Sequence, residues 1–565
     1  MNSQTLIDTP TADKPPSKRF NLRRINRWTV LTLLIALLMS LPLLVVSSSI
    51  FQPLNENWQH LKDYLLTEYI INSLILMVGV SVGVLSMGVI TAWLTSMCEF
   101  KGRRLFSWML LLPLAIPAYI IAYTYTGFLD FAGPLQTLLR EWTGWGYRDY
   151  WFPEVRSMGG AITMLSLVLY PYVYMMARAA FLEQSVCALE ASRTLGSTPL
   201  NGFFRVALPL ARPAIVTGLS LALMETLADF GTVQYFGVST FTTSIFRTWF
   251  GVGDGTTASQ LSAMLLMFVF ALIMLERWSR RRAKFHHTSQ KYAKIKRFQL
   301  RGKTAFFAGL ACLLPVLFGF ILPALQLLWW VFTTAEETLD ASFFQLTLNS
   351  MLLAISASVI AVSIALLLAY GRRLHKTPAI RTGVNIASLG YAIPGTVIAV
   401  GVMTPFAFVD NALDSWMQAT FGLSTGLILS GTVFALLFAY TVRFLAVSVQ
   451  AIESGLGKIK PTMDDAGRSM GLSPMSVLRQ IHLPLMRGTV LTALLLVFVD
   501  VLKELPATLI LRPFNFNTLA VRAHELAADE RLADAATPAL MIVLVGIIPV
   551  ILLSKAISHS RVGGK

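Results

Sequence analysis

The feature that most constrains this chain is a series of long apolar runs. Of its 565 residues, 55% are hydrophobic and only 13% are charged, a composition too apolar for a soluble globular domain. A helix needs about 20 apolar residues to cross a bilayer. Twelve runs approach that length, at residues 28–50, 71–96, 106–127, 160–181, 213–233, 258–276, 304–332, 348–370, 385–409, 425–449, 489–510 and 537–557. The sequence therefore predicts an all-α membrane protein with about twelve transmembrane helices.

Positive charge is distributed unevenly among the segments that connect these runs. The net charge is +16, and with the N-terminus in the cytoplasm the cytoplasmic segments hold 37 of the 46 Lys and Arg residues. An excess of Lys and Arg in cytoplasmic loops is a general rule of membrane topology. We therefore predict a multi-pass protein with both termini cytoplasmic, and attribute the basic charge to topology and not to nucleic-acid binding.

One polar segment occurs twice, displaced by 275 residues. The first copy contains Glu190, Ala191, Ser192 and Gly196, followed by Pro209. The second copy, with the same spacing, contains Asp465, Ala466, Gly467 and Gly471, followed by Pro484.

Each copy lies between apolar runs, so we expect a short helix, a turn and a second helix outside the hydrocarbon. Gly196 and Gly471 suit a helix C-terminus where φ turns positive, and Pro209 and Pro484 suit the point of re-entry into the membrane. One copy alone could be an ordinary amphipathic connector. Two copies in register favour a repeated functional element.

Other residues repeat with nearly the same displacement, so the chain reads as two tandem halves. Asn72 recurs as Asn349, and the prolines of the third run, Pro113 and Pro117, have a counterpart in Pro394. We expect these prolines to break or kink their helices, either as structural bends or as a transport hinge. The predicted divisions are a basic tail at 1–27, a six-helix domain at 28–276, a basic cytoplasmic linker at 277–303 and a second six-helix domain at 304–565. Six crossings per half predict a pseudo-twofold axis along the membrane normal.

No segment has the pattern of a catalytic or nucleotide-binding site. The stretch beginning at Gly455 is closest to a phosphate-binding loop, but it lacks the earlier glycine and the Ser or Thr that follows the lysine. The cysteines Cys98, Cys187 and Cys312 are far apart, and no His and Cys cluster has metal-ligand spacing. The sequence therefore predicts no enzyme, and no cofactor bound by this chain.

The runs that follow the repeated segments carry ionisable residues. Glu225 and Asp229 are four residues apart, which would place them on one helix face, and Asp500, Lys503 and Glu504 repeat this pattern in the second half. Charges at such depth are costly unless they are paired or hydrated. They indicate either a structural and gating network, in which Lys503 neutralises Asp500, or direct contact with a transported cation.

The repeated segment resembles the Glu-Ala-Ala loop of bacterial ABC importer permeases, which docks in a groove of the ATPase subunit. The stretches beginning at Leu227, Thr243 and Lys503 are similar to those of fused iron(III) importer permeases, over essentially the whole chain. That resemblance implies an inner-membrane permease for Fe³⁺, two copies of a separate ATPase that binds the ATP, and a periplasmic binding protein. Fused thiamine permeases share this architecture. A proton-driven transporter of six plus six helices is the alternative from another class, but it does not predict the repeated loop.

Overall fold

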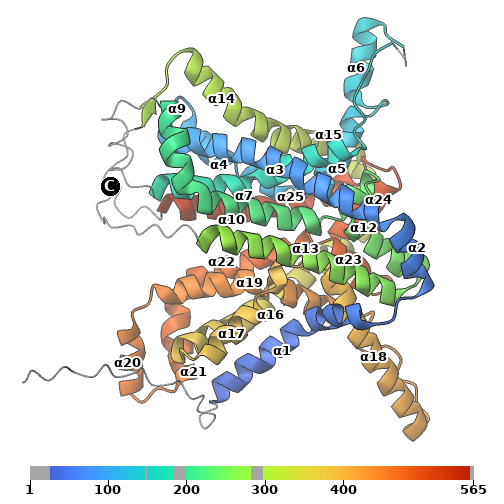
Figure 1. The fold of residues 1–565 in the computed structure, drawn as a ribbon, viewed down its shortest axis with the longest axis vertical. Coiled ribbons are helices and arrows are strands. Elements are labelled where there is room, and N and C mark those ends of the chain that lie inside the picture. The colour runs from blue at the N-terminus through green and yellow to red at the C-terminus, as the bar shows by residue number, and fades with distance from the viewer. Residues whose placement is uncertain (1–25, 147–148, 184–198, 282–296, 560–565) are drawn as a thin grey trace, which may run out of the picture.

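The computed structural model describes residues 26–146, 149–183, 199–281 and 297–559, and these are almost entirely helical (Figure 1). The first half contains α1 (Arg27–Ser48), η2 (Ser49–Phe51), α2 (Glu56–Tyr64), α3 (Leu66–Met97), α4 (Arg103–Met109), η3 (Leu112–Ala115), α5 (Ala118–Leu129), α6 (Pro134–Thr143), α7 (Met158–Glu183), α9 (Pro199–Gly202), η4 (Phe203–Ala207), α10 (Leu208–Ala228), α11 (Gly231–Tyr235), α12 (Phe241–Phe246), η5 (Arg247–Val252) and α13 (Gly255–Arg281).

The second half contains α14 (Lys303–Val316), η6 (Leu317–Ile321), α15 (Leu322–Thr338), α16 (Ala341–Leu374), α17 (Pro378–Ala387), η7 (Gly390–Ala392), α18 (Gly395–Phe421), α19 (Val433–Gly457), α20 (Pro461–Ser469), α21 (Pro474–Val477), η8 (Leu478–His482), α22 (Leu483–Leu502), α23 (Pro506–Leu511), α24 (Leu519–Ala528) and α25 (Ala536–His559). A short parallel bridge joins β1 (Cys98–Glu99) to β2 (Phe298–Gln299). It attaches the end of the predicted linker to the turn between α3 and α4.

The predicted membrane protein is confirmed. Within the described residues, ten helices are long and apolar enough to cross a bilayer, and a bent pair makes an eleventh candidate. The segment predicted at 537–557 coincides with α25, whose apolar described part, Ala536–Ile551, is shorter than the other spans. Each predicted run thus coincides with a helix or a broken helix.

Proline breaks the third span of each half, as expected. Pro117 lies between η3 and α5, and the chain bends by 92° between Arg103–Ala115 and Ala118–Thr143. Pro394 lies at the same place between η7 and α18. Because proline lacks an N–H and its ring clashes with the preceding turn, it begins a new helix more readily than it continues one.

The helices pack in equivalent ways in the two halves, but the halves are interlocked. Helices α3, α7 and α10 pack together, as do α16, α19 and α22. The buried apolar side chains of the described residues form two clusters, and α1 and α13 of the first half join the cluster of the second. Conversely, α14, α15 and α25 join the cluster of the first half. The division of the sequence at 276 and 303 stays a prediction, because neither half packs as a separate body.

Candidate functional site

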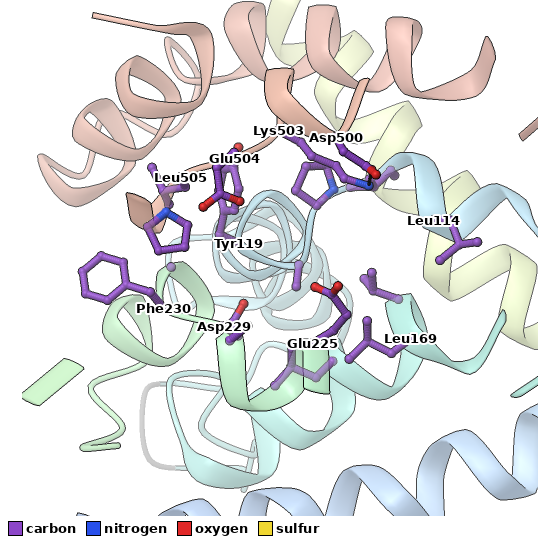
Figure 2. Close-up of a pocket in the computed structure, with 18 of the residues that line it drawn as sticks. Leu114, Tyr119, Leu169, Glu225, Asp229, Phe230, Asp500, Lys503, Glu504 and Leu505 are labelled. Carbon is purple, nitrogen blue, oxygen red and sulfur yellow. Dashed lines mark ion pairs between the residues drawn. The ribbon is translucent and has the colours of Figure 1, made fainter. Parts of the chain in front are cut away.

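One cavity of about 130 Å³ between the halves is lined by all five ionisable residues predicted in the runs that follow the repeated segments, namely Glu225, Asp229, Asp500, Lys503 and Glu504. Figure 2 shows Glu225 and Asp229 on one wall, with Asp500, Lys503 and Glu504 on the opposite wall. Helix breaks border the cavity: it is lined by Pro117 at the start of α5, by Gly231 at the start of α11 and by Pro506 at the start of α23. The sequence pattern correctly identified residues that lie together.

The expectation that Glu225 and Asp229 share one helix face is wrong in detail. Helix α10 ends at Ala228, and Asp229 has an extended backbone conformation with ψ of 132°. Its carboxylate accepts hydrogen bonds from the N–H groups of Thr232 and Val233, both at 3.1 Å, and from the Thr232 hydroxyl at 2.9 Å. Asp229 therefore caps α11, because the first N–H groups of a helix have no partner within it.

Glu225, one turn earlier on α10, is the acidic cavity residue without such a structural role. Among the residues that the structure describes, its carboxylate forms no hydrogen bond or ion pair, and it points into the cavity (Figure 2). Its side chain is only partly buried, and Arg443 and Lys503 are the nearby basic groups that attract it. Glu225 is therefore the carboxylate in this cavity most available to a ligand.

In the second half, the helix also ends earlier than expected. Helix α22 ends at Leu502, so Lys503 and Glu504 lie in the break before α23. The predicted neutralisation of Asp500 is present, with Lys503 Nζ 2.8 Å from Asp500 Oδ1.

Arg443, which sequence reasoning missed, lies 3.1 Å from Glu504, and the two side chains are 9% and 6% exposed. The 37 Lys and Arg residues assigned above to cytoplasmic segments included Arg443, and for this residue the assignment was wrong, because it lies inside α19 and lines the cavity. Its position within the apolar run 425–449 was the available signal.

The cavity therefore has more acidic than basic groups, namely four carboxylates against Lys503 and Arg443. Both basic groups come from the second half and pair with acids of that half. The tyrosines Tyr119, Tyr172 and Tyr391 also line it. Within the described part of the chain, no three His, Cys, Asp or Glu side chains are grouped to hold a metal ion.

The second copy of the repeated segment has the expected helix, turn and helix. Asp465, Ala466 and Gly467 belong to α20, and Gly471 follows it with φ of +79°. The N–H of Leu472 donates to the Gly467 carbonyl and the N–H of Gly471 to the Arg468 carbonyl, a pattern that satisfies the last carbonyls of a helix.

Gly467 has a role that helix propensity alone did not indicate. A Cβ there would lie 3.0 Å from side-chain atoms of Val477 and Ile481. Glycine at this position therefore allows α20 to pack closely against the segment after the turn.

Pro209 and Pro484 each stand at the start of a long span, α10 and α22. In both halves a π-helical turn precedes the proline, with Leu208 N–H bonded to the Phe203 carbonyl and Leu483 N–H to the Leu478 carbonyl. The wider turn relieves the clash that a proline ring makes with an α-helical carbonyl. Glu190, Ala191, Ser192 and Gly196 lie outside the described residues.

Comparison with known proteins finds similarity to membrane transport proteins. The family model for the inner membrane component of binding-protein-dependent transport systems matches residues 84–284. The Fe(3+)-transport system permease protein FbpB 2 of Haemophilus influenzae is 26% identical over 541 residues, covering 94% of this chain and 99% of that protein.

Two further relatives are matched over less than two thirds of their own length. The ferric transport system permease protein FbpB of Actinobacillus pleuropneumoniae is 23% identical over 71% of this chain and 58% of that protein. The molybdenum transport system permease protein ModB of Escherichia coli is 30% identical over 26% of this chain and 61% of that protein. These relatives are permease proteins of transport systems and not enzymes. Residues 84–284 of this chain are thus similar to the inner membrane components of binding-protein-dependent transport systems.

Proposed function

We propose that this chain is the membrane-spanning subunit of an ATP-driven ABC importer that carries Fe³⁺ into the cytoplasm. The observation that carries the proposal is the match to an Fe(3+) permease over nearly the full length of both proteins. The cavity supports it, because its carboxylates outnumber its basic groups and hard oxygen ligands suit Fe³⁺. Composition favours a cation but does not single out iron.

In this mechanism a periplasmic binding protein delivers Fe³⁺ to the outer face. Two copies of a separate ATPase bind the coupling segments, Glu190–Gly196 and Asp465–Gly471, on the cytoplasmic side. ATP-driven closure of the ATPases moves both segments, and the halves alternate between outward-open and inward-open states. The ATP stays on the partner subunits.

The placement of helices supports this coupling. Helices α9 and α20, which belong to the two repeated segments, lie at the same end of the bundle, and α2 lies at the other end (Figure 1). The distribution of Lys and Arg supports a cytoplasmic location for that end and for both termini. A coupling mechanism of this kind requires that both ends of the protein bias the same two states.

The test is reconstitution in liposomes with the candidate ATPase and binding protein, followed by uptake of radioactive Fe³⁺ with and without ATP. We expect Glu190→Arg and Asp465→Arg to abolish uptake, and Asp63→Arg in α2, an exposed charge reversal at the opposite end, to preserve it. Uptake driven by a proton gradient without any ATPase would refute the proposal. Uptake of thiamine but not Fe³⁺ would refute the substrate assignment alone.

A further inference from the structure

A buried cluster of polar side chains lies beneath the second coupling segment. Arg373, in the last turn of α16, donates from Nε to Asp464 Oδ2 at 2.7 Å. The other carboxylate oxygen of Asp464 contacts His482 Nε2. Asp464 lies in the first turn of α20, and His482 is the last residue of η8, directly before α22. Their side chains are 16%, 10% and 0% exposed, in the order Arg373, Asp464 and His482.

Arg373 also binds the end of a third helix. Its Nη2 donates to the Ile459 carbonyl at 2.9 Å, and its Nη1 donates to the Leu456 carbonyl. The last carbonyls of a helix have no partner within it, so the guanidinium caps α19 while it holds Asp464. One cluster thus connects α16, α19, α20 and the start of α22.

Further contacts hold the segment around this cluster. The Tyr370 hydroxyl donates to the Pro474 carbonyl at 2.9 Å, and the Tyr370 ring lies 5.4 Å from that of His482. Gly467 allows close approach of α20 to Val477. Helices α20 and α21, which lie on either side of the turn, are therefore fixed to each other and to α16.

The first half has different chemistry at the corresponding sequence positions. The 275-residue displacement aligns Asp464 with Leu189 and His482 with Ala207, and the 277-residue displacement of Asn72 and Asn349 aligns Arg373 with Ser96. None of these three first-half side chains can carry charge.

Tyr370 aligns with Trp93 in the same way, and Trp93 packs against Phe181 and Phe203 with ring centroids 5.6 and 4.9 Å apart. In the described part of the first half, Trp93 thus packs against aromatic rings at the position where Tyr370 donates a hydrogen bond.

We propose that Asp464 is a positioning residue that locks the second coupling segment into one rigid unit with α16, α19 and α22, through which ATPase motion reaches those spans. The part of this inference that concerns ATPase motion rests on the proposed function, whereas the lock between Asp464, Arg373 and His482 does not depend on it. Asp464 precedes Asp465 of the repeated pattern and takes no part in that pattern. Its bonds to Arg373 and His482 cross from α20 to both neighbouring spans, so displacement of α20 moves those spans directly.

The first experiment measures amide hydrogen exchange of residues 461–469 in the full chain in lipid nanodiscs. The test variant, Arg373→Ser/Asp464→Leu/His482→Ala, installs the first-half residues and leaves no single buried charge behind. We expect exchange at least about tenfold faster than in the wild type. The control, Arg372→Gln, removes the neighbouring half-exposed ion pair with Glu453, whose atoms are 2.9 Å apart, and should leave exchange unchanged. Unchanged exchange in the triple variant would overturn the lock.

The second experiment measures radioactive Fe³⁺ transported per ATP hydrolysed by the assembled complex in liposomes. We expect the triple variant to assemble and hydrolyse ATP but to transport at least about fivefold less Fe³⁺ per ATP, a loss equivalent to about 1 kcal/mol of coupling. A merely structural role would lower transport and hydrolysis together, and an unchanged ratio would overturn the positioning role. If the wild-type chain fails to couple to any ATPase, the proposed function fails instead, while the exchange measurement still decides the lock.

Discussion

Arg443 and Glu504 form a buried ion pair, with Nη1 and Oε1 3.1 Å apart, where α19 meets the break between α22 and α23. Glu504 Oε1 also accepts a hydrogen bond from the Ala507 N–H at 3.2 Å, within the first turn of α23. The pair therefore balances charge in the cavity and fixes the geometry of a helix break. Removing one partner leaves a buried charge uncompensated, which is far more costly than replacing both.

Arg443→Met should accordingly destabilise the protein by about 3–5 kcal/mol. Arg443→Met/Glu504→Gln should recover part of this loss, because the glutamine is neutral and can still accept the Ala507 hydrogen bond. Thermal unfolding of the purified protein in detergent measures both effects. The control is Arg531→Met, whose partner Asp534 lies 2.7 Å away but whose own side chain is 60% exposed. A single variant more stable than the double variant would contradict this account.

Gly395→Ala should disturb the ion pair between Arg443 and Glu504 without changing either charged residue. A Cβ on Gly395, the first residue of α18, would clash with Arg443 Nη1 and Glu504 Oε1. Overpacking of this kind costs about 1–3 kcal/mol. Gly309→Ala in α14 is the matched control, since nothing lies within 4 Å of a Cβ there, and it should be neutral or stabilising. Equal unfolding temperatures for the two variants would show that the Gly395 contact is not required.

The length of the apolar runs was sufficient to predict the membrane fold, and the position of ionisable residues inside those runs was sufficient to select residues that share one cavity. Both can be read from a single segment of sequence, because the thickness of the bilayer sets the length of a span and its apolar interior makes charged residues rare there. The break near Asp229 was not predicted, because that site lacks the proline that marked the breaks at Pro117 and Pro394. The break near Glu504 was also missed, although Pro506 at the start of α23 was an available signal. At both breaks the carboxylates themselves bind the backbone N–H groups of the following helix.

Three other features depend on contacts between segments distant in the chain. The pairing of Arg443 with Glu504 joins residues 61 positions apart, and that of Arg373 with Asp464 joins residues 91 apart. The packing of α1 against the second half is likewise a tertiary property. Periodicity and spacing within one segment cannot predict such partners.

Lys503→Ala should reduce transport more than Asp500→Ala/Lys503→Ala does. The single change leaves the Asp500 carboxylate, now 2.8 Å from the lysine nitrogen, without its counter-charge beside the other cavity acids. Initial rates of ATP-driven Fe³⁺ uptake in liposomes compare the two variants at equal amounts of folded complex. An equal or smaller loss in the single variant would count against a functional pair.

Glu225→Gln separates contact with the substrate from structural support. Because Glu225 makes no hydrogen bond or ion pair with other described residues, we expect its neutral variant to fold at least as stably as the wild type. If Glu225 contacts a passing cation, Fe³⁺ uptake should fall at least about tenfold, the loss of roughly 1.4 kcal/mol of interaction. Asp229→Asn provides the contrast, since it weakens the cap of α11 and should lower the unfolding temperature. Normal uptake by Glu225→Gln would leave gating as the remaining role of the cavity acids.

One ion pair between the two halves should stabilise the protein less at low pH. Arg156 Nη1 and Nη2 bind Glu530 Oε1 and Oε2 at 2.7 and 2.8 Å, and the hydrogen bond from Arg156 holds the pKa of Glu530 below its usual 4.5. A carboxylate with a lowered folded pKa stabilises the protein above pH 4.5, and that contribution is lost as pH falls through the folded value. The unfolding temperature of Glu530→Gln should therefore be below that of the wild type at pH 7, and the difference should shrink as the pH falls through the folded pKa of Glu530. The difference should also shrink in 1 M salt, since Glu530 is 60% exposed and such pairs are screened. A difference that stays constant as the pH falls would assign the effect to packing and not to charge.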